Sequence, residues 1–366
     1  MTEFSVKPGA LRTYAHLLGE YGGAGLNLAD LYDMKVPAYT SSNVEIDLQS
    51  GTGDLFQHII GSNTSLVSNL RSSYLEAWSM FRVSAVNLDI SATVYRDTDE
   101  QQAERMDRVW KGLPPPVPVD DAATGATVSD PTVVLDSTPS SDVMLPDPVH
   151  WVMDAAGWLS VGDDVLKVAS VFGFDPASTL TKAVVGDYGQ VARAGHACTA
   201  LAECERANAT AVTAGLTQMT AHWTGQGADA ATAYFHQVAN AFRAHADQLD
   251  DVAHKYELLA QACAQIAEIL SGLLADALDK LLICVGALAS AGCLQAVPVV
   301  DVIADIIGAY EVFVTARSIK TFTEACGRVT DIVETFLGLT FAIASACEPG
   351  TATTSFPVGA YRNESQ

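Results

Sequence analysis

The feature that most constrains the fold is an apolar stripe that runs without a break through the third quarter of the sequence. Its members recur at spacings of three and four residues, which is the period of one face of an α-helix. They are Phe235, Val238, Phe242, His245, Leu249, Val252, Tyr256, Leu259, Cys263, Ile266, Leu270 and Leu273. Because a helix of this length with one apolar face needs another helix against it, the stripe predicts long helices packed side by side.

A second stripe of the same kind lies in the first third of the chain. It consists of Val67, Leu70, Tyr74, Trp78, Phe81, Ala85, Leu88, Ala92 and Tyr95. A further helix is predicted before each stripe. One begins near Pro8, loosens through "YGGAG" and ends before Pro37, and the other runs from about Asp187 to His222. Each half of the chain is therefore predicted to form a long helical hairpin.

A proline-rich segment separates the two hairpins. Residues 113–148 hold eight of the fourteen prolines and six aspartates, with no lysine or arginine, which is typical of an extended linker. We therefore expect an all-α fold of two helical-hairpin domains, residues 1–112 and 149–347, joined by this acidic linker. Short helices broken at glycine and proline are expected between positions 150 and 190. Residues 348–366 are expected to be a flexible tail.

The second domain is expected to contain additional apolar helices after Lys280. Residues 281–300, "LLICVGALASAGCLQAVPVV", carry no charge and are long enough to cross a bilayer. Glycine, serine, glutamine and Pro298 weaken this segment as a membrane span, so a buried core helix or helical hairpin is the preferred interpretation. A membrane span is the alternative.

The net charge indicates which classes of partner are unfavourable. The chain carries 43 acidic and 20 basic residues, a formal charge of −23. Such a charge repels nucleic acid and anionic lipid, so no nucleic-acid partner is expected. The first residues, "MTEFSVKPGALRTYAHLL", lack a basic region followed by a continuous apolar core, so no ordinary signal peptide is expected.

No catalytic, cofactor or metal site is predicted. The sequence contains no G-x-S-x-G, H-E-x-x-H or C-x-x-C motif and no glycine-rich phosphate loop. His196 is close to two cysteines, but their spacing on a helix places the thiols on different faces, which disfavours a shared metal ion. His245 is expected to be a hydrogen-bonded core residue. The pair Asp250 and Asp251 is expected to be solvated, because adjacent helical residues point apart.

The cysteines are predicted to be buried, reduced thiols. All of them follow residue 190, their spacing is irregular, and most lie within apolar helical pattern. One or two disulfides remain an alternative. The seven are Cys198, Cys204, Cys263, Cys284, Cys293, Cys326 and Cys347.

Two short motifs stand out at the ends of the predicted helices. In Trp223-Thr224-Gly225, glycine can take the backbone conformation that reverses the chain, and the tryptophan is expected to lie half-buried over the turn with its N–H near water. Tyr95 closes the second stripe, and Asp99 follows one helical turn later on the same face. In one interpretation Tyr95 is the last core residue of the helix and Asp99 is a solvated carboxylate. In the other, the two side chains form one small surface that binds a receptor with a pocket for the ring and a basic group for the carboxylate.

These motifs carry a resemblance to known proteins. The W-x-G motif, the following "ADAATAYF" and the long helix after it, over residues 186–270, resemble the WxG family of helical-hairpin substrates of type VII (ESX) secretion systems. Residues 1–112, in "SVKPGALRTYAHLL", "GDLFQHIIGSNTSLVSNL" and "YRDTDEQQAERMD", resemble the EspC-like secretion-associated proteins of the same systems. The resemblance implies that Trp223 and Gly225 mark the hairpin turn, and that Tyr95 and Asp99 match the Tyr-x-x-x-Asp/Glu export signal.

The sequence departs from these families in two places. The predicted turn of the first hairpin has "SGTGD" in place of W-x-G, and in the second hairpin Tyr256 is followed four residues later by Ala260 rather than by an acidic residue. The tyrosine signal and the W-x-G motif are therefore separated by the linker. The resemblance does not predict whether the two hairpins pack on each other or on another protein.

The resemblance implies a non-enzymatic substrate or accessory protein of a type VII system of actinobacteria, mycobacterial and virulence-associated. Such a protein is secreted or held in the cell envelope. Its expected partners are another helical protein or a second copy, and the secretion machinery or a chaperone, with membrane contact through residues 281–347 as an option. The alternative is the export region of a polymorphic toxin, membrane-active or pore-forming. A third option is a cytosolic chaperone or adaptor.

Overall fold

The computed structural model describes residues 5–19, 27–49, 54–109, 130–136, 186–290, 309–347 and 361. In this part of the chain nearly every residue is helical, so the predicted all-α class is confirmed. The short elements are β1 (Ser5–Val6), α1 (Pro8–Leu18), α2 (Leu28–Asp30), the π-helical turn η1 (Leu31–Lys35), α3 (Val36–Tyr39), a second π-helical turn η2 (Thr40–Val44), the 3-10 turn η3 (Pro131–Asp136) and β2 (Trp223–Thr224). The long helices are α4 (Asp54–Val109), α8 (Tyr188–Thr220), α9 (Gln226–Ser290) and α11 (Ala309–Ser345).

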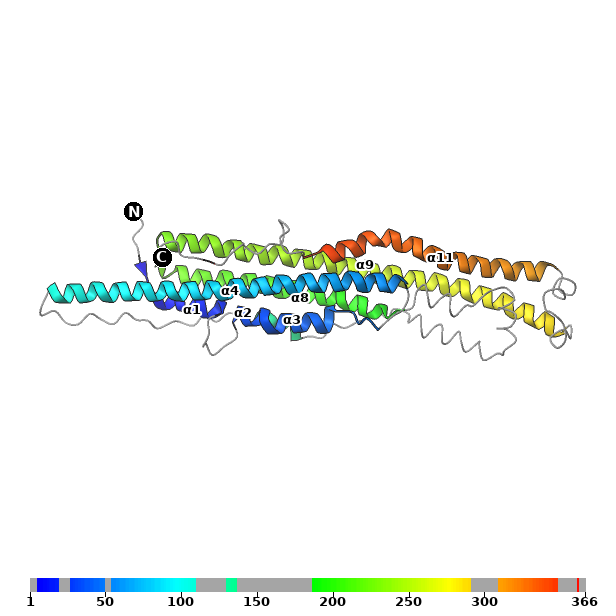
Figure 1. Ribbon diagram of the computed structural model, residues 1–366, viewed down its shortest axis with the longest axis horizontal. Coiled ribbons are helices and arrows are strands. Elements are labelled where there is room, and N and C mark those ends of the chain that lie inside the picture. The colour runs from blue at the N-terminus through cyan, green and yellow to red at the C-terminus, as the bar shows by residue number, and fades with distance from the viewer. Residues whose placement is uncertain are drawn as a thin grey trace.

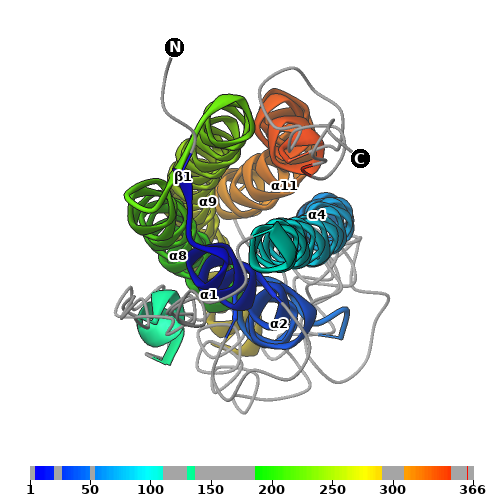
Figure 2. The ribbon, with the colours of Figure 1, turned by 90° about the vertical axis from the view of Figure 1, so that its left-hand side faces the viewer.

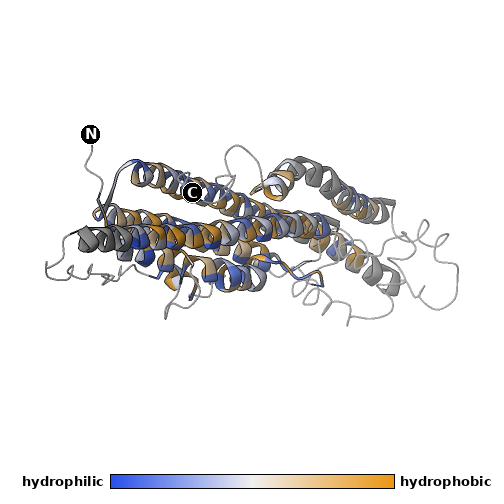
Figure 3. Ribbon diagram, turned by 60° about the vertical axis from the view of Figure 1, so that its left-hand side comes forward, coloured by the Kyte–Doolittle hydropathy of each residue, from blue (hydrophilic) through white to orange (hydrophobic). Residues whose placement is uncertain are grey.

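The long helices run along a common axis and form an elongated bundle (Figure 1). α8 packs along α9, and α11 packs against both α9 and α4. α1 lies against α4 and α8, with α2 beside it in the view down the bundle (Figure 2). The coloured parts of the long helices carry both apolar and polar residues (Figure 3), as expected of helices that bury one face.

The two apolar stripes form the core as the sequence predicts. In α9 every member of the stripe is buried except Leu273, which is partly buried. In α4 the members are buried except Trp78 and Tyr95, which are also partly buried. The helix starts agree with their residues: Pro8 is the first residue of α1, and Asp187 caps α8 by accepting a hydrogen bond from the Gly189 N–H at 3.0 Å.

The N-terminal and C-terminal halves share one hydrophobic core. The rings of Phe81 in α4 and Phe242 in α9 stack at 5.4 Å between centroids. Asn63 of α4 donates a hydrogen bond to the Tyr256 hydroxyl of α9 at 2.7 Å. The Tyr14 hydroxyl of α1 donates to the carbonyl of Val212 in α8 at 3.1 Å. The hairpins that the sequence predicts in each half therefore pack on each other.

The expected end of the first helix before Pro37 was wrong. α1 ends at Leu18, and a new helical stretch from α2 to η2 runs through Pro37. Proline is tolerated because it stands in the first turn of α3, where its missing N–H is not needed. The π-helical turns on either side provide the change of pitch, with the Val36 N–H bonded to the Leu31 carbonyl.

Part of the predicted linker is ordered against the bundle. η3 contacts α8 and α3, and its first two residues, Pro131 and Thr132, are buried. Lys35 donates a hydrogen bond to the Thr132 hydroxyl at 2.8 Å and lies 3.7 Å from the Asp130 carboxylate. The short helices predicted within residues 150–185, and residues 291–300 of the apolar run, lie outside the described residues.

Candidate functional site: the Trp223 end of the bundle

The W-x-G motif forms the chain reversal between α8 and α9. Gly225 has a backbone φ of +113°, which side chains other than glycine rarely adopt. Its carbonyl accepts the Asp229 N–H at 3.0 Å, which begins the hydrogen bonding of α9. Gly225 therefore lies between α8 and α9 in the left-handed backbone conformation that glycine favours.

A short two-stranded sheet fixes this turn to the N-terminal segment. β1 pairs antiparallel with β2, so that Val6 lies opposite Trp223 and Ser5 opposite Thr224. The Ser5 N–H donates to Thr224 Oγ1 at 3.1 Å, and the Lys7 N–H donates to the His222 carbonyl at 2.9 Å. Sequence periodicity did not predict this sheet, because each of its strands is only two residues long.

Trp223 is fully buried, and the expectation that it is half-exposed was wrong. Its side chain is 1% exposed, and its indole N–H is buried without a hydrogen-bond partner among the described residues. Two elements from outside the hairpin of α8 and α9 enclose it: β1 pairs along it, and α4 places Tyr95 beside it.

Tyr95 and Trp223, the two residues that the sequence singled out in separate halves, are in contact. Their ring centroids lie 6.2 Å apart, with an edge-to-face angle of 62°. Glycine at position 227 favours the contact, because a Cβ there would lie tightly, at 3.0 Å from Trp223 Cζ2 and 3.3 Å from Tyr95 Oη. Gly227 thus allows α9 to approach both rings closely, a role that the sequence analysis missed.

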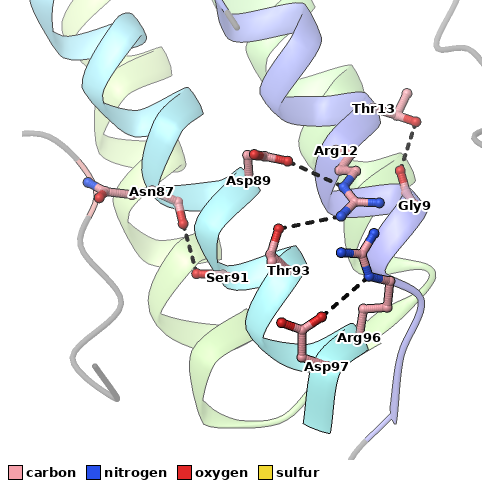
Figure 4. A network of polar contacts seen from close by, with 9 residues as sticks. All are labelled: Gly9, Arg12, Thr13, Asn87, Asp89, Ser91, Thr93, Arg96 and Asp97. Carbon is pink, nitrogen blue, oxygen red and sulfur yellow. Dashed lines mark hydrogen bonds and ion pairs between the residues drawn. The ribbon is translucent and has the colours of Figure 1, made fainter. Parts of the chain in front are cut away.

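Polar contacts hold α4 against α1 next to Tyr95 (Figure 4). Arg12 lies 3.3 Å from the Asp89 carboxylate and 3.4 Å from the Thr93 hydroxyl. One turn further along α4, Arg96 and Asp97 lie 3.6 Å apart. The backbone of Asp99 is helical and follows Tyr95 by one turn, while its side chain lies outside the described part of the structure.

A second group of polar residues lies in the centre of the bundle. His245 is 0% exposed, and its Nδ1 lies 3.4 Å from the carboxylate of buried Glu205. The Tyr32 hydroxyl donates to the other oxygen of Glu205 at 2.8 Å and accepts from Asn208 at 2.6 Å. Burial alone would lower the pKa of His245, but the Cys347 thiol and the Glu205 carboxylate beside it raise it to about 10.

This central group confirms the core position of His245. It also includes Glu205 and Tyr32, which the sequence analysis missed. Burial raises the pKa of the Tyr32 hydroxyl, and the neighbouring Glu205 carboxylate raises it further. A buried carboxylate on an otherwise apolar helical face is the signal that could have indicated such a group.

The described cysteines are buried and free, as predicted. Burial raises the pKa of the Cys263 thiol to about 12 and that of Cys326 to about 11, so both are uncharged and unreactive at neutral pH. Burial also raises the pKa of Cys198 and Cys204. Within the described ranges no three His, Cys, Asp or Glu side chains are arranged to hold a metal ion.

His196 and Asp250 lie apart from the Trp223 turn, in a groove between α8 and α9. The groove has a volume of about 280 Å³, and its lining includes the small residues Gly195 and Ala253.

A comparison of the chain with protein-family models, with curated proteins and with solved structures gave no match.

Proposed function

We propose that the protein is a non-enzymatic substrate or accessory protein of a type VII (ESX) secretion system, exported without a signal peptide. In this proposal Tyr95 and Asp99 form the export signal, and Trp223 and Gly225 form the hairpin turn that supports it. The observation that carries the proposal is the contact between the Tyr95 and Trp223 rings, which are 128 positions apart in the sequence but 6.2 Å apart in space. A receptor would meet the partly exposed Tyr95, which the buried Trp223 of the turn holds in position from within the bundle.

An exposed apolar face on α4 supports a helical partner. Its members recur at spacings of three and four, are between 41% and 49% exposed, and lie on the side of α4 opposite to the buried stripe that Tyr95 closes. They are Val83, Val86, Ile90 and Val94. Because β-branched residues at this period suit helix-on-helix packing, a partner helix could lie along this face while the side of α4 that carries Tyr95 stays against the bundle.

Export into the culture medium tests the proposal. The tagged full-length chain is expressed in a mycobacterial host, and cell pellet and culture filtrate are blotted for the wild type, Tyr95→Ala and Asp99→Asn. We expect the wild type in the filtrate or envelope fraction. For both variants we expect the ratio of pellet protein to exported protein to be at least ten times that of the wild type. The matched control is Asp97→Asn, which removes an exposed carboxylate two residues earlier.

Two outcomes contradict the proposal. If Asp99→Asn and Tyr95→Ala are exported as well as the wild type, then the two residues are only the end of a helix face. If the wild type stays in the cytosol of a host whose secretion machinery is active, the chaperone or adaptor interpretation replaces this one. Tyr95→Phe separates packing from recognition, because it keeps the ring beside Trp223 and removes only the hydroxyl.

A membrane-active role is the second candidate, and the composition of α9 favours it. Within the described residues, the stretch Gln226–Leu281 is long and apolar enough to cross a membrane, and 40% of its most apolar window is buried. Ile269 and Ile283 on the same helix are exposed. Leakage of dye from neutral lipid vesicles at pH 5 to pH 8 tests this role, and intact vesicles over that range would exclude it.

A further inference from the structure

Tyr361, near the end of the chain, occupies a position between α4 and α9. Its side chain is 3% exposed. Its backbone N–H donates to Ser84 Oγ at 3.1 Å, and its carbonyl accepts a hydrogen bond from Asn87 Nδ2. Ser84 and Asn87 are three residues apart on one face of α4, so their side chains match the two backbone groups of a single residue.

The Tyr361 ring packs against aromatic residues of α9. Its centroid lies 5.8 Å from the rings of both Tyr234 and Phe235, which are themselves edge to face at 5.0 Å. The Tyr361 hydroxyl is buried and has no hydrogen-bond partner among the described residues. The α9 side of this position therefore favours an aromatic ring and offers no hydrogen bond to a hydroxyl on that ring.

The hydrogen bonds between Tyr361 and the described residues of α4 are made by its main chain. Main-chain hydrogen bonds do not distinguish one sequence from another, so any extended segment that presents an aromatic residue can make the same contacts. Burial and the nearby Tyr95 raise the pKa of Tyr361 to about 12, as expected of two phenols in one region of the bundle.

We propose that this position is a peptide-binding site for an extended segment with a central aromatic residue, and that Tyr361 fills it as an exchangeable intramolecular ligand. We call it the tail site, and it consists of Ser84, Asn87, Tyr234 and Phe235. The inference does not depend on the proposed export role. A tethered ligand acts at a millimolar effective concentration, so the wild-type tail competes with any free peptide.

Peptide binding to the full-length protein tests the inference. A fluorescein-labelled peptide of residues 355–366, "SFPVGAYRNESQ", is titrated into the wild type and into Tyr361→Ala, and binding is followed by fluorescence anisotropy. We expect Tyr361→Ala to bind the peptide at least tenfold more tightly than the wild type, because its own tail no longer fills the site. A Tyr361→Phe peptide should bind at least as tightly as the unmodified peptide, and a Tyr361→Ala peptide at least tenfold more weakly.

A matched pair of serines on α4 locates the site. In the Tyr361→Ala protein, the added change Ser84→Ala should weaken peptide binding about tenfold, because the backbone N–H of the peptide loses its buried acceptor. The control is Ser79→Ala, at an exposed position of the same helix, which should leave binding unchanged. Equal effects of the two changes would overturn the assignment of the site.

Three further results would overturn the inference. One is equal binding of the peptide to the wild type and to Tyr361→Ala, and another is no binding to either. The third is a wild-type dimer that Tyr361→Ala converts to a monomer, because the tail would then act between copies. If Tyr361→Ala does not fold, amide exchange at Tyr361 of the wild type tests whether the tail can be displaced. Excess peptide should accelerate this exchange, and an unchanged rate contradicts the proposal.

Discussion

At the scale of single residues, Gly225 has the most demanding backbone conformation of the W-x-G turn. Its φ of +113° is strained for any residue with a Cβ. We expect Gly225→Ala to lower the free energy of unfolding by about 2 kcal/mol, measured by urea denaturation. Gly61→Ala is the control, because Gly61 lies within α4 and a Cβ there meets nothing within 4 Å. That change should stabilise the protein by about 0.5 kcal/mol, and a similar loss for both glycines would contradict the role of Gly225.

The raised pKa of His245, which lies beside Cys347 and Glu205, predicts how the stability of the protein depends on pH. The folded-state pKa of His245 is raised to about 10 from 6.5. Protonated His245 therefore contributes its full stabilisation below about pH 6.5, and this stabilisation is lost as the pH rises toward 10. Between these two pKa values the free energy of unfolding falls by about 1.4 kcal/mol for each pH unit. Buried thiols add a loss of the same sign only above about pH 8.5, so the range from pH 6.5 to pH 8 isolates the histidine.

The pH prediction is checked by urea unfolding at pH 6.5, 7.2 and 8. The wild type should lose stability across this range, whereas His245→Gln should be less stable throughout but should show a flatter dependence. His254→Gln is the control, since His254 is exposed and 3.8 Å from Glu257 on the same helix. Parallel curves for the wild type and His245→Gln would contradict the prediction.

At the scale of elements, the short sheet of β1 and β2 covers Trp223. Thr224→Val removes the side-chain acceptor of the Ser5 N–H while keeping the shape of the residue. We expect a local loss of about 1 kcal/mol, seen as roughly fivefold faster amide exchange at Ser5 and Lys7. Thr210→Val is the control, because the Thr210 hydroxyl bonds to the Arg206 carbonyl of its own helix. Unchanged exchange at Ser5 would show that β1 does not depend on Thr224.

The elements that the sequence predicts correctly are those defined by periodicity. The stripes of α4 and α9 repeat over many turns, so the faces they bury follow from helix geometry alone. Pro37 was interpreted wrongly and η3 was not predicted, because the structure of both depends on neighbours far away in the sequence. Pro37 lies in a helical stretch that packs on α4, and η3 is fixed in part by Lys35, nearly a hundred positions earlier. Local composition carries no information about such contacts.

At the scale of the whole molecule, periodicity shows which face of a helix is apolar but not which helix covers it. The sequence therefore indicated Tyr95 and Trp223 separately and left their relation open. The structure brings them together because α4 packs on the other half of the chain, through stacked rings such as Phe81 and Phe242. Contact between the two motifs is thus a property of the whole bundle and not of either hairpin.

This shared core predicts that the two halves fold only together. A fragment of residues 1–112 would expose the face of α4 that carries Phe81, and the buried polar bond between Asn63 and Tyr256 would be lost. We expect this fragment alone to be largely unfolded by circular dichroism. Co-expressed with residues 149–366, it should form a 1:1 complex that elutes as one peak and unfolds in a single transition. Fragments that unfold cooperatively on their own and do not associate would instead show two independent domains, in which Tyr95 meets Trp223 only because the linker holds them close.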